Sequence, residues 1–171
     1  YAKLITQLFG DRMYIANATG CSSIWANSSP STPYTTNKKG QGPAWSNSLF
    51  ENNAEFSYGM CLAVKQLRDC VPGYVKELDA MTKDEAVKAA IAKWLETYDD
   101  LDASTPATEE LVKLLESGKF STEEQRLVDE ILKRRKDLSK KTMWMYGGDG
   151  WAYDIGYGGL DHVFAMGEDV N

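Results

Sequence analysis

The residues best suited to chemistry lie near the C-terminal end of the chain, in the run Gly147-Gly148-Asp149-Gly150-Trp151. The apolar segment 143–146 precedes this run and predicts a strand that ends at the glycines. An Asp between glycines offers a hard oxygen ligand to a divalent cation, and glycines let a phosphate approach the backbone. A metal-bridged diphosphate is therefore one hypothesis for this turn. An ordinary turn is the other, because Asp and Gly are common turn residues.

A second turn of small residues, Thr19-Gly20-Cys21-Ser22-Ser23, follows a short apolar segment at 13–17. As a thiolate, Cys21 could be a nucleophile or a ligand to a soft metal centre, and a structural thiol is the alternative. A Cys–His hydrolase would need His162, the one histidine of the chain, which we expect to lie within a helix and to pack or make a helix hydrogen bond instead. An iron–sulfur cluster needs about four thiolates, so further ligands would have to come from elsewhere.

The helices and strands that must position these two turns are predicted from the hydrophobic pattern and from turn residues such as Gly and Pro. Residues 13–17 indicate a buried strand, residues 28–45 a long ordered loop, and residues 48–70 a helix. Residues 141–171 indicate a strand, a glycine loop and a helix over about 155–165. Parallel α/β sheets bind ligands at the carboxyl ends of their strands. We therefore expect residues 19–23 and 148–151 to meet at one edge of a mostly parallel sheet flanked by helices.

Residues 73–140 differ in composition, being dense in Lys, Glu, Leu and Ala. Capping boxes are expected at Thr82–Glu85 and Ser121–Glu124, and Thr105-Pro106 suits the start of a helix between them. Three or four amphipathic helices are predicted here. The α/β core thus comprises residues 1–72 and 141–171, and residues 73–140 form a helical insertion within one domain.

Composition narrows the class of protein. With 19 basic and 25 acidic residues the net charge is −6, which argues against a nucleic-acid surface. No apolar run is long enough to span a bilayer and Tyr1 starts no signal peptide, so a cytoplasmic location is expected. The cysteines Cys61 and Cys70 are expected on a helix, and no CxxC is present. We expect the chain to be a piece of a larger protein that continues beyond both ends.

Three long strings carry a resemblance to a known family. They are Ile15-Ala16-Asn17-Ala18-Thr19-Gly20-Cys21-Ser22-Ser23-Ile24-Trp25, the segment 40–51 (GQGPAWSNSLFE), and the segments 147–156, 158–163 and 167–171 taken together. In these strings the chain resembles pyruvate:ferredoxin (flavodoxin) oxidoreductase. The match is strong over residues 1–72 and 141–171, and rests mainly on position over the helical block.

The resemblance implies a fragment of the thiamine-diphosphate-binding domain of a larger enzyme. That enzyme oxidatively decarboxylates pyruvate with coenzyme A to acetyl-CoA and CO2, passing electrons through [4Fe–4S] clusters to ferredoxin or flavodoxin. It implies that Asp149 ligates Mg2+, that Gly148, Gly150 and Trp151 lie along the diphosphate of thiamine diphosphate, and that Cys21 ligates the proximal cluster. Phe50 matches a position beside the cofactor. No residue of the fragment is expected to transfer protons.

The resemblance also implies what must come from outside the fragment. The remaining cluster cysteines, the remaining Mg2+ ligands and the activating glutamate are expected in the rest of the same polypeptide, which is expected to be a homodimer. We expect the fragment alone to be inactive and to bind no cluster. The alternatives are a related 2-oxoacid oxidoreductase with a different substrate, a cluster-free thiamine enzyme, and a non-catalytic interaction module built on residues 73–140.

Overall fold

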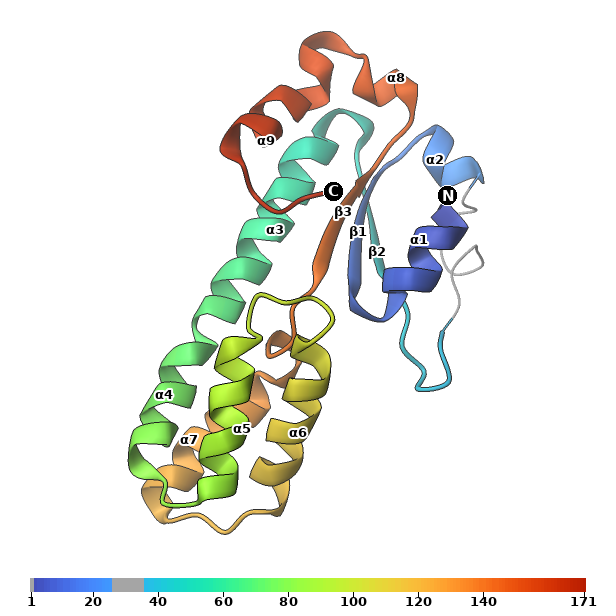
Figure 1. Ribbon diagram of the computed structural model, residues 1–171. Helices are drawn as coiled ribbons and strands as arrows, with labels where there is room; N and C mark the ends of the chain where they lie inside the picture. The colour runs from blue at the N-terminus through green and yellow to red at the C-terminus, as the bar shows by residue number, and fades with distance from the viewer. Residues whose placement is uncertain (1, 26–35) are drawn as a thin grey trace. The chain divides into compact units, whose positions relative to one another are not determined.

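The computed structural model describes residues 2–25 and 36–171, which form two compact units (Figure 1). The first unit combines residues 1–63 with residues 141–171, and the second comprises residues 64–140. In sequence, the second unit thus interrupts the first. Each unit is described by itself below.

The described part of the first unit contains a parallel three-stranded sheet in the order β2-β1-β3. Its strands are β1 (Met13–Ala18), β2 (Ala44–Ser48) and β3 (Thr142–Tyr146). In the register, Ile15 of β1 lies opposite Trp45 of β2 and Trp144 of β3. The central strand is almost wholly buried, as expected of a parallel strand covered on both faces. The predicted α/β class is confirmed.

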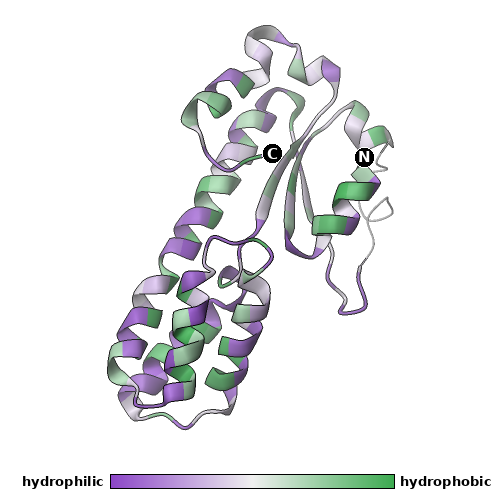
Figure 2. Ribbon diagram, viewed as in Figure 1, coloured by the Kyte–Doolittle hydropathy of each residue, from purple (hydrophilic) through white to green (hydrophobic). Residues whose placement is uncertain are grey.

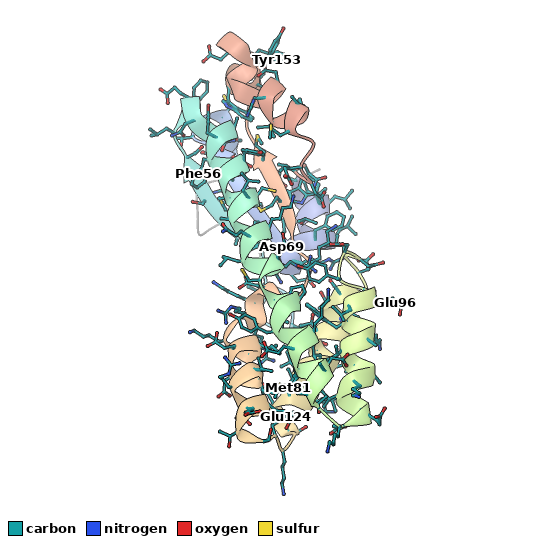
Figure 3. All side chains as sticks on the ribbon, turned by 90° about the vertical axis from the view of Figure 1, so that its left-hand side faces the viewer. Phe56, Asp69, Met81, Glu96, Glu124 and Tyr153 are labelled. Carbon is teal, nitrogen blue, oxygen red and sulfur yellow. The ribbon has the colours of Figure 1, made fainter. Side chains whose placement is uncertain are left out.

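Helices lie on both sides of this sheet, with α1 on one side and α3 on the other (Figures 1 and 3). The helical elements of the first unit are α1 (Ala2–Phe9), η1 (Gly10–Arg12), α2 (Cys21–Trp25), η2 (Phe50–Asn52), α8 (Asp149–Ala152), η4 (Ile155–Gly159) and α9 (Leu160–Met166). Helix α3 (Asn53–Asp69) begins in the first unit and ends in the second.

The structure corrects several boundaries in this unit. Strand β2 was missed, because its sequence AWSNS lacks the apolar alternation that predicts a strand. The helix expected from residue 48 begins at Asn53, after the 3-10 turn η2. The turn expected at residues 19–23 becomes helical at Cys21. Residues 26–35 of the expected long loop lie outside the described residues.

The helix expected over 155–165 is wrong in its first half. Gly156, Tyr157 and Gly158 have φ of 68°, 53° and 59°, and α9 begins only at Leu160. Right-handed helices need negative φ, so this left-handed stretch cannot continue the helix toward α8. The glycines at three of the four positions 156–159 make such a backbone accessible.

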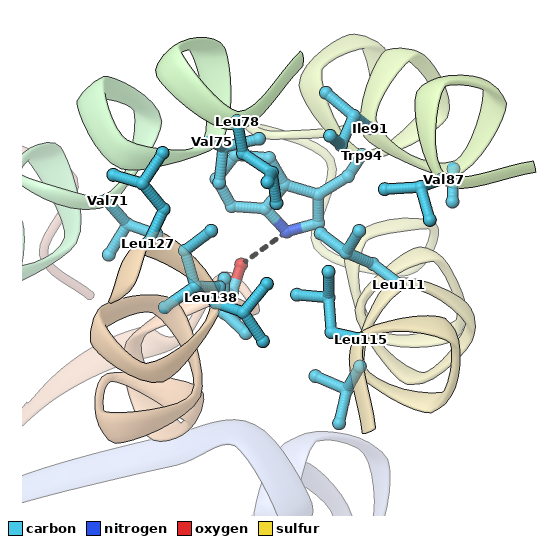
Figure 4. Close-up of a cluster of buried hydrophobic side chains, with 14 of the residues drawn as sticks. Val71, Val75, Leu78, Val87, Ile91, Trp94, Leu111, Leu115, Leu127 and Leu138 are labelled. Atoms are coloured by element: carbon cyan, nitrogen blue, oxygen red, sulfur yellow. Dashed lines mark hydrogen bonds between the residues drawn. The ribbon is translucent and has the colours of Figure 1, made fainter. Parts of the chain in front are cut away.

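The second unit is helical and has its own core. Its elements are α4 (Val71–Met81), α5 (Glu85–Glu96), α6 (Ser104–Ser117), α7 (Thr122–Lys133) and η3 (Arg135–Asp137). Trp94 is fully buried among aliphatic side chains, and its Nε1 donates to the Leu138 carbonyl at 3.1 Å (Figure 4). The same Nε1 lies 3.2 Å from Thr108 Oγ1. The predicted amphipathic helices are confirmed.

The N-terminal cap predicted for α7 is confirmed, and the one predicted for α5 is wrong. At α7 both hydrogen bonds of the predicted capping box between Ser121 and Glu124 are present. At α5 the cap is Asp84, not Thr82, because the Asp84 carboxylate accepts from the backbone N–H groups of Ala86 and Val87. Hydrophilic residues interrupt the hydrophobic ones along these helices (Figure 2), and within residues 2–25 and 36–171 no helix is both long and apolar enough to cross a membrane.

Candidate functional site

The two turns singled out by sequence meet at the carboxyl edge of the sheet. Strands β1 and β3 are adjacent and parallel, so the segments that follow them leave the sheet at the same edge. A Cβ placed on Gly148 would lie 3.2 Å from Cys21 Cβ and 4.0 Å from Cys21 Sγ. The predicted meeting of residues 19–23 with residues 148–151 is confirmed.

Phe50 touches both turns. It lies at the start of η2, just after β2, and its ring is half-buried. A Cβ on Gly20 would lie 3.4 Å from the Phe50 ring, and one on Gly150 would lie 3.6 Å from it. The glycines therefore permit the close approach of the two turns to one aromatic ring. Residues that follow all three strands of the sheet converge here.

Asp149 is the first residue of α8 and is exposed to solvent. Its Oδ1 accepts a hydrogen bond of 3.0 Å from the backbone N–H of Gly150. This bond holds the carboxylate close to the backbone of its own turn. An exposed carboxylate so held is suited to contribute one oxygen ligand to a hard cation.

Trp151 is buried, with 4% of its surface exposed, and packs with Ala18, Ala54 and Val163. Its ring lies against two glycines. A Cβ on Gly147 would lie 2.6 Å from Cζ3 of the indole, and a Cβ on Gly158 would lie 2.6 Å from Nε1. Within the described residues Nε1 has no hydrogen-bond partner. The structure therefore makes Trp151 the anchor of α8 in the core, and its role along a cofactor stays a prediction.

Two asparagines that the sequence analysis did not single out hold this edge together. Asn17, at the end of β1, and Asn53, at the start of α3, are both fully buried. The Asn53 side chain accepts from Ser48 Oγ at 2.8 Å and donates to the Tyr146 carbonyl at 3.0 Å, which links the ends of β2 and β3. A polar residue at the end of an otherwise buried strand was the available signal for Asn17.

His162 lies on α9 with its ring exposed. The ring packs edge-to-face against Tyr58 of α3, with 6.2 Å between centroids. In the described part of the chain no hydrogen bond joins His162 to Cys21. The expected packing role of His162 therefore agrees with the structure, and nothing in this geometry favours a Cys–His hydrolase.

The described residues of the site supply only some of the ligands that a Mg2+ ion or a [4Fe–4S] cluster needs. Among residues 2–25 and 36–171, no group of three or more His, Cys, Asp or Glu side chains is placed to hold a metal ion. Asp149 offers one exposed carboxylate and Cys21 one exposed thiol. These two groups fit a Mg2+ ion and a [4Fe–4S] cluster by ligand type. Each supplies one ligand of several.

A cavity of about 280 Å³ lies elsewhere in the first unit. Its lining includes Lys3, Asp11 and Gln41. Because Asp11 precedes β1 and Gln41 precedes β2, this cavity lies at the amino ends of the strands. It is therefore at the opposite edge from the residues described above.

Comparison with known proteins finds close relatives over the whole chain. It is 52% identical to the pyruvate:ferredoxin oxidoreductase of Moorella thermoacetica, 48% to the pyruvate-flavodoxin oxidoreductase of Klebsiella pneumoniae, and 42% to a pyruvate dehydrogenase [NADP(+)] of Cryptosporidium parvum. All of the chain is covered in each case, but only 15%, 14% and 10% of the respective relatives. A scan against protein-family models finds no match.

Proposed function

We propose that this chain, which along its whole length matches a segment of the pyruvate:ferredoxin and pyruvate-flavodoxin oxidoreductases, forms part of the thiamine-diphosphate site of such an enzyme. The observation that supports this proposal most is the convergence of Cys21, Phe50 and Gly148–Gly150 at one edge of a parallel sheet. The similarity covers every residue of that edge. The whole enzyme would oxidatively decarboxylate pyruvate with coenzyme A to acetyl-CoA and CO2.

The names of the relatives support pyruvate as the substrate more than any one electron acceptor. Ferredoxin, flavodoxin and NADP+ each occur in one of the three names, whereas pyruvate occurs in all three. A segment similar to all three therefore serves chemistry that they share. In our proposal ferredoxin or flavodoxin is the acceptor for this protein, and a related 2-oxoacid is the alternative substrate. The homodimer and the cytoplasmic location stay predictions.

Within this site each residue has a distinct proposed part. Asp149 would supply one oxygen ligand to the Mg2+ that binds the diphosphate, and Gly148 and Gly150 leave the adjacent backbone uncovered. Cys21 would supply one thiolate to a [4Fe–4S] cluster. Thiamine diphosphate, when bound, stabilises the carbanion left by decarboxylation. In this proposal the chain's own task is to bind and orient these groups, and no residue of the chain is assigned a proton transfer.

The apposition of Cys21 and Gly148 gives the proposal its physical sense. In the proposed enzyme the organic cofactor would take up the electrons of the 2-oxoacid, and a metal centre nearby would accept them. A thiolate ligand in van der Waals reach of the diphosphate turn would keep the two groups close. In a cluster-free thiamine enzyme a thiol at that position would not be a cluster ligand.

The test uses the complete polypeptide that carries this chain, assayed with pyruvate and with other 2-oxoacids. Asp149→Asn should weaken binding of Mg2+ and thiamine diphosphate by roughly 10–100-fold, measured by calorimetry, because a metal ligand is lost. Cys21→Ser should abolish the electron paramagnetic resonance signal of one cluster while leaving thiamine diphosphate bound.

Matched controls separate these roles from general damage. Asp161→Asn, on α9, and Cys70→Ser, an exposed thiol in the second unit, should change neither readout. Loss of cofactor binding in Asp161→Asn, or a full set of cluster signals in Cys21→Ser, would contradict the proposal. Full activity of Cys21→Ser would favour a cluster-free thiamine enzyme.

A further inference from the structure

Asn17 is a polar side chain with no exposed surface, at the end of the central strand. A buried amide is costly unless its groups are hydrogen-bonded. Its Nδ2 donates to Ser23 Oγ at 2.8 Å, to Asn47 Oδ1 at 2.9 Å and to the Ala18 carbonyl at 3.0 Å. Its Oδ1 accepts from Ser22 Oγ at 2.7 Å. The amide therefore bonds the turn after β1 on one side and the end of β2 on the other.

The turn that Asn17 holds is the one that carries Cys21. Ser22 and Ser23 follow Cys21 directly on α2, a helix of only five residues. Such a short helix is not stable by itself, so contacts outside it must fix its position. The Cys21 thiol is exposed and makes no side-chain hydrogen bond with described residues. Its place is therefore set by its neighbours in sequence and by the amide beneath them.

The hydrogen bonds continue from Asn17 to β3, the strand that precedes Gly148. The Ser48 hydroxyl donates its one proton to Asn53 Oδ1 at 2.8 Å, and the same Oγ lies 3.3 Å from the Asn17 carbonyl. Asn53 in turn donates to the carbonyl of Tyr146, two residues before Gly148. A continuous buried network thus joins the Cys21 turn to the end of β3.

We propose that Asn17 is a positioning residue, which holds the Cys21 turn against Gly148. Its amide bonds both serines of that turn and Asn47 of β2, and the Ala18 carbonyl also accepts from the two serine hydroxyls. The consequence for a cluster beside thiamine diphosphate rests on the proposed function. The geometric claim does not, since it concerns only residues of this chain.

A disulfide trap measures this apposition directly. The backbone of Gly148, with φ of −92° and ψ of 174°, is one that any residue adopts. A Cβ there would lie 3.2 Å from Cys21 Cβ, and disulfides have Cβ–Cβ separations of about 3.5–4.5 Å, so a small shift suffices. The complete polypeptide carrying Gly148→Cys, freed of metal, is treated with oxidised glutathione, which accepts the two electrons. Peptide mapping then follows the bond between positions 21 and 148.

In this background Asn17→Asp should slow formation of the bond by roughly tenfold, because buried hydrogen bonds are lost. The carboxylate cannot donate, yet it would face the Ala18 carbonyl and Asn47 Oδ1. Asn47→Asp is the matched control. Both hydrogen bonds to Asn47 end on Oδ1, from Asn17 and from Trp45 Nε1, so the same chemical change keeps them. This control should stay within about twofold of the parent, since its bonds are unchanged.

Equal trapping rates in Asn17→Asp and in its parent would overturn the proposal, as would failure of Gly148→Cys to trap at all. If Asn17→Asp loses its far-ultraviolet circular dichroism, Ser22→Ala replaces it. This variant removes the hydroxyl that donates to Asn17 Oδ1, and it should slow formation of the disulfide by about threefold. An unchanged rate in Ser22→Ala would then overturn the proposal.

A spectroscopic readout links the result to the proposed function without merging the two tests. In the metal-loaded polypeptide with Gly148 intact, Asn17→Asp should shift or broaden the cluster signal assigned through Cys21→Ser, and Asn47→Asp should not. If Cys21→Ser changes no cluster signal, the proposed function fails, while the trapping rates still decide the role of Asn17.

Discussion

At the scale of single residues, the site depends on glycines, because they leave room for a neighbouring aromatic ring. Gly147 and Gly158 both lie against the indole of Trp151, where a Cβ would come within 2.6 Å of ring atoms. Of the two, Gly147 does not have positive φ, so only the contact forbids a side chain there. The buried indole therefore fixes the position of the helix that begins with Asp149.

Gly147→Ala should lower the free energy of unfolding by about 1–3 kcal/mol, because the added methyl group overpacks the indole. The measurement is chemical denaturation of the complete polypeptide. Gly59→Ala is the matched control, since a Cβ there meets nothing within 4 Å and Gly59 lies inside α3. This control should gain about 0.5–1 kcal/mol from helix propensity.

The effect of Gly147→Ala on the free energy of unfolding should also depend on Trp151. With Trp151 replaced by Ala, the methyl group of Gly147→Ala has no ring to meet, so its cost should largely vanish. An equal cost of Gly147→Ala in both backgrounds would show that the indole contact is not its cause.

At the scale of elements, the junction of α3 and α5 is held by a buried cation and an aromatic ring. The guanidinium of Arg68 lies 3.7 Å from the centroid of the Tyr98 ring and donates to the Tyr98 carbonyl. Tyr98 hydroxyl donates to Asp69 at 3.3 Å. Burial, the largest cause, raises the pKa of Tyr98 to about 12 and lowers that of Arg68.

This raised pKa predicts a loss of stability at alkaline pH. Tyr98 ionises near pH 10 in the unfolded chain but near 12 in the folded one, so unfolding releases its proton between those values. The stabilisation is complete below pH 10 and falls as pH rises toward 12. Tyr98→Phe has no proton to release, and its unfolding free energy should fall less over this range in urea titrations. An equal fall of the unfolding free energy with pH in Tyr98→Phe and in its parent would contradict the prediction.

At the scale of the whole molecule, the described residues fall into two units with separate cores. The second unit, residues 64–140, buries Trp94, Leu111, Leu127 and Ile131 completely. The described members of its hydrophobic cluster all lie within residues 71–138. A segment with its own core is able to fold as a domain.

Residues 64–140 produced alone should therefore unfold cooperatively, as followed by far-ultraviolet circular dichroism. Leu111→Ala should cost about 2–5 kcal/mol in this unit, because it leaves a cavity in the core. Leu67→Ala makes the same change at a side chain that is 51% exposed, and should cost far less. Equal effects of the two substitutions, or no cooperative transition at all, would show that this unit depends on the rest of the chain.

Residue patterns alone were enough to predict the α/β class, the amphipathic helices, the Ser121 capping box and the meeting of the Cys21 and Asp149 turns at one edge. Periodicity, capping residues and glycine-rich strand ends are local signals, and strand direction follows from them. The resemblance to a family was also present in the strings around Cys21 and Asp149. These features were therefore accessible without coordinates.

The residues that hold that edge together became apparent from the three-dimensional contacts. The buried amide of Asn17, the strand β2 with its polar sequence, and the slot for Trp151 between two glycines all depend on partners distant in sequence. A local pattern can mark a polar residue in a buried strand, as at Asn17, but it does not identify the partners, because a buried hydrogen bond or a close packing contact is a property of the pair. The left-handed run at 156–158 was missed for a related reason: a backbone fixed by packing against the indole at Gly158 overrode the apparent helical pattern.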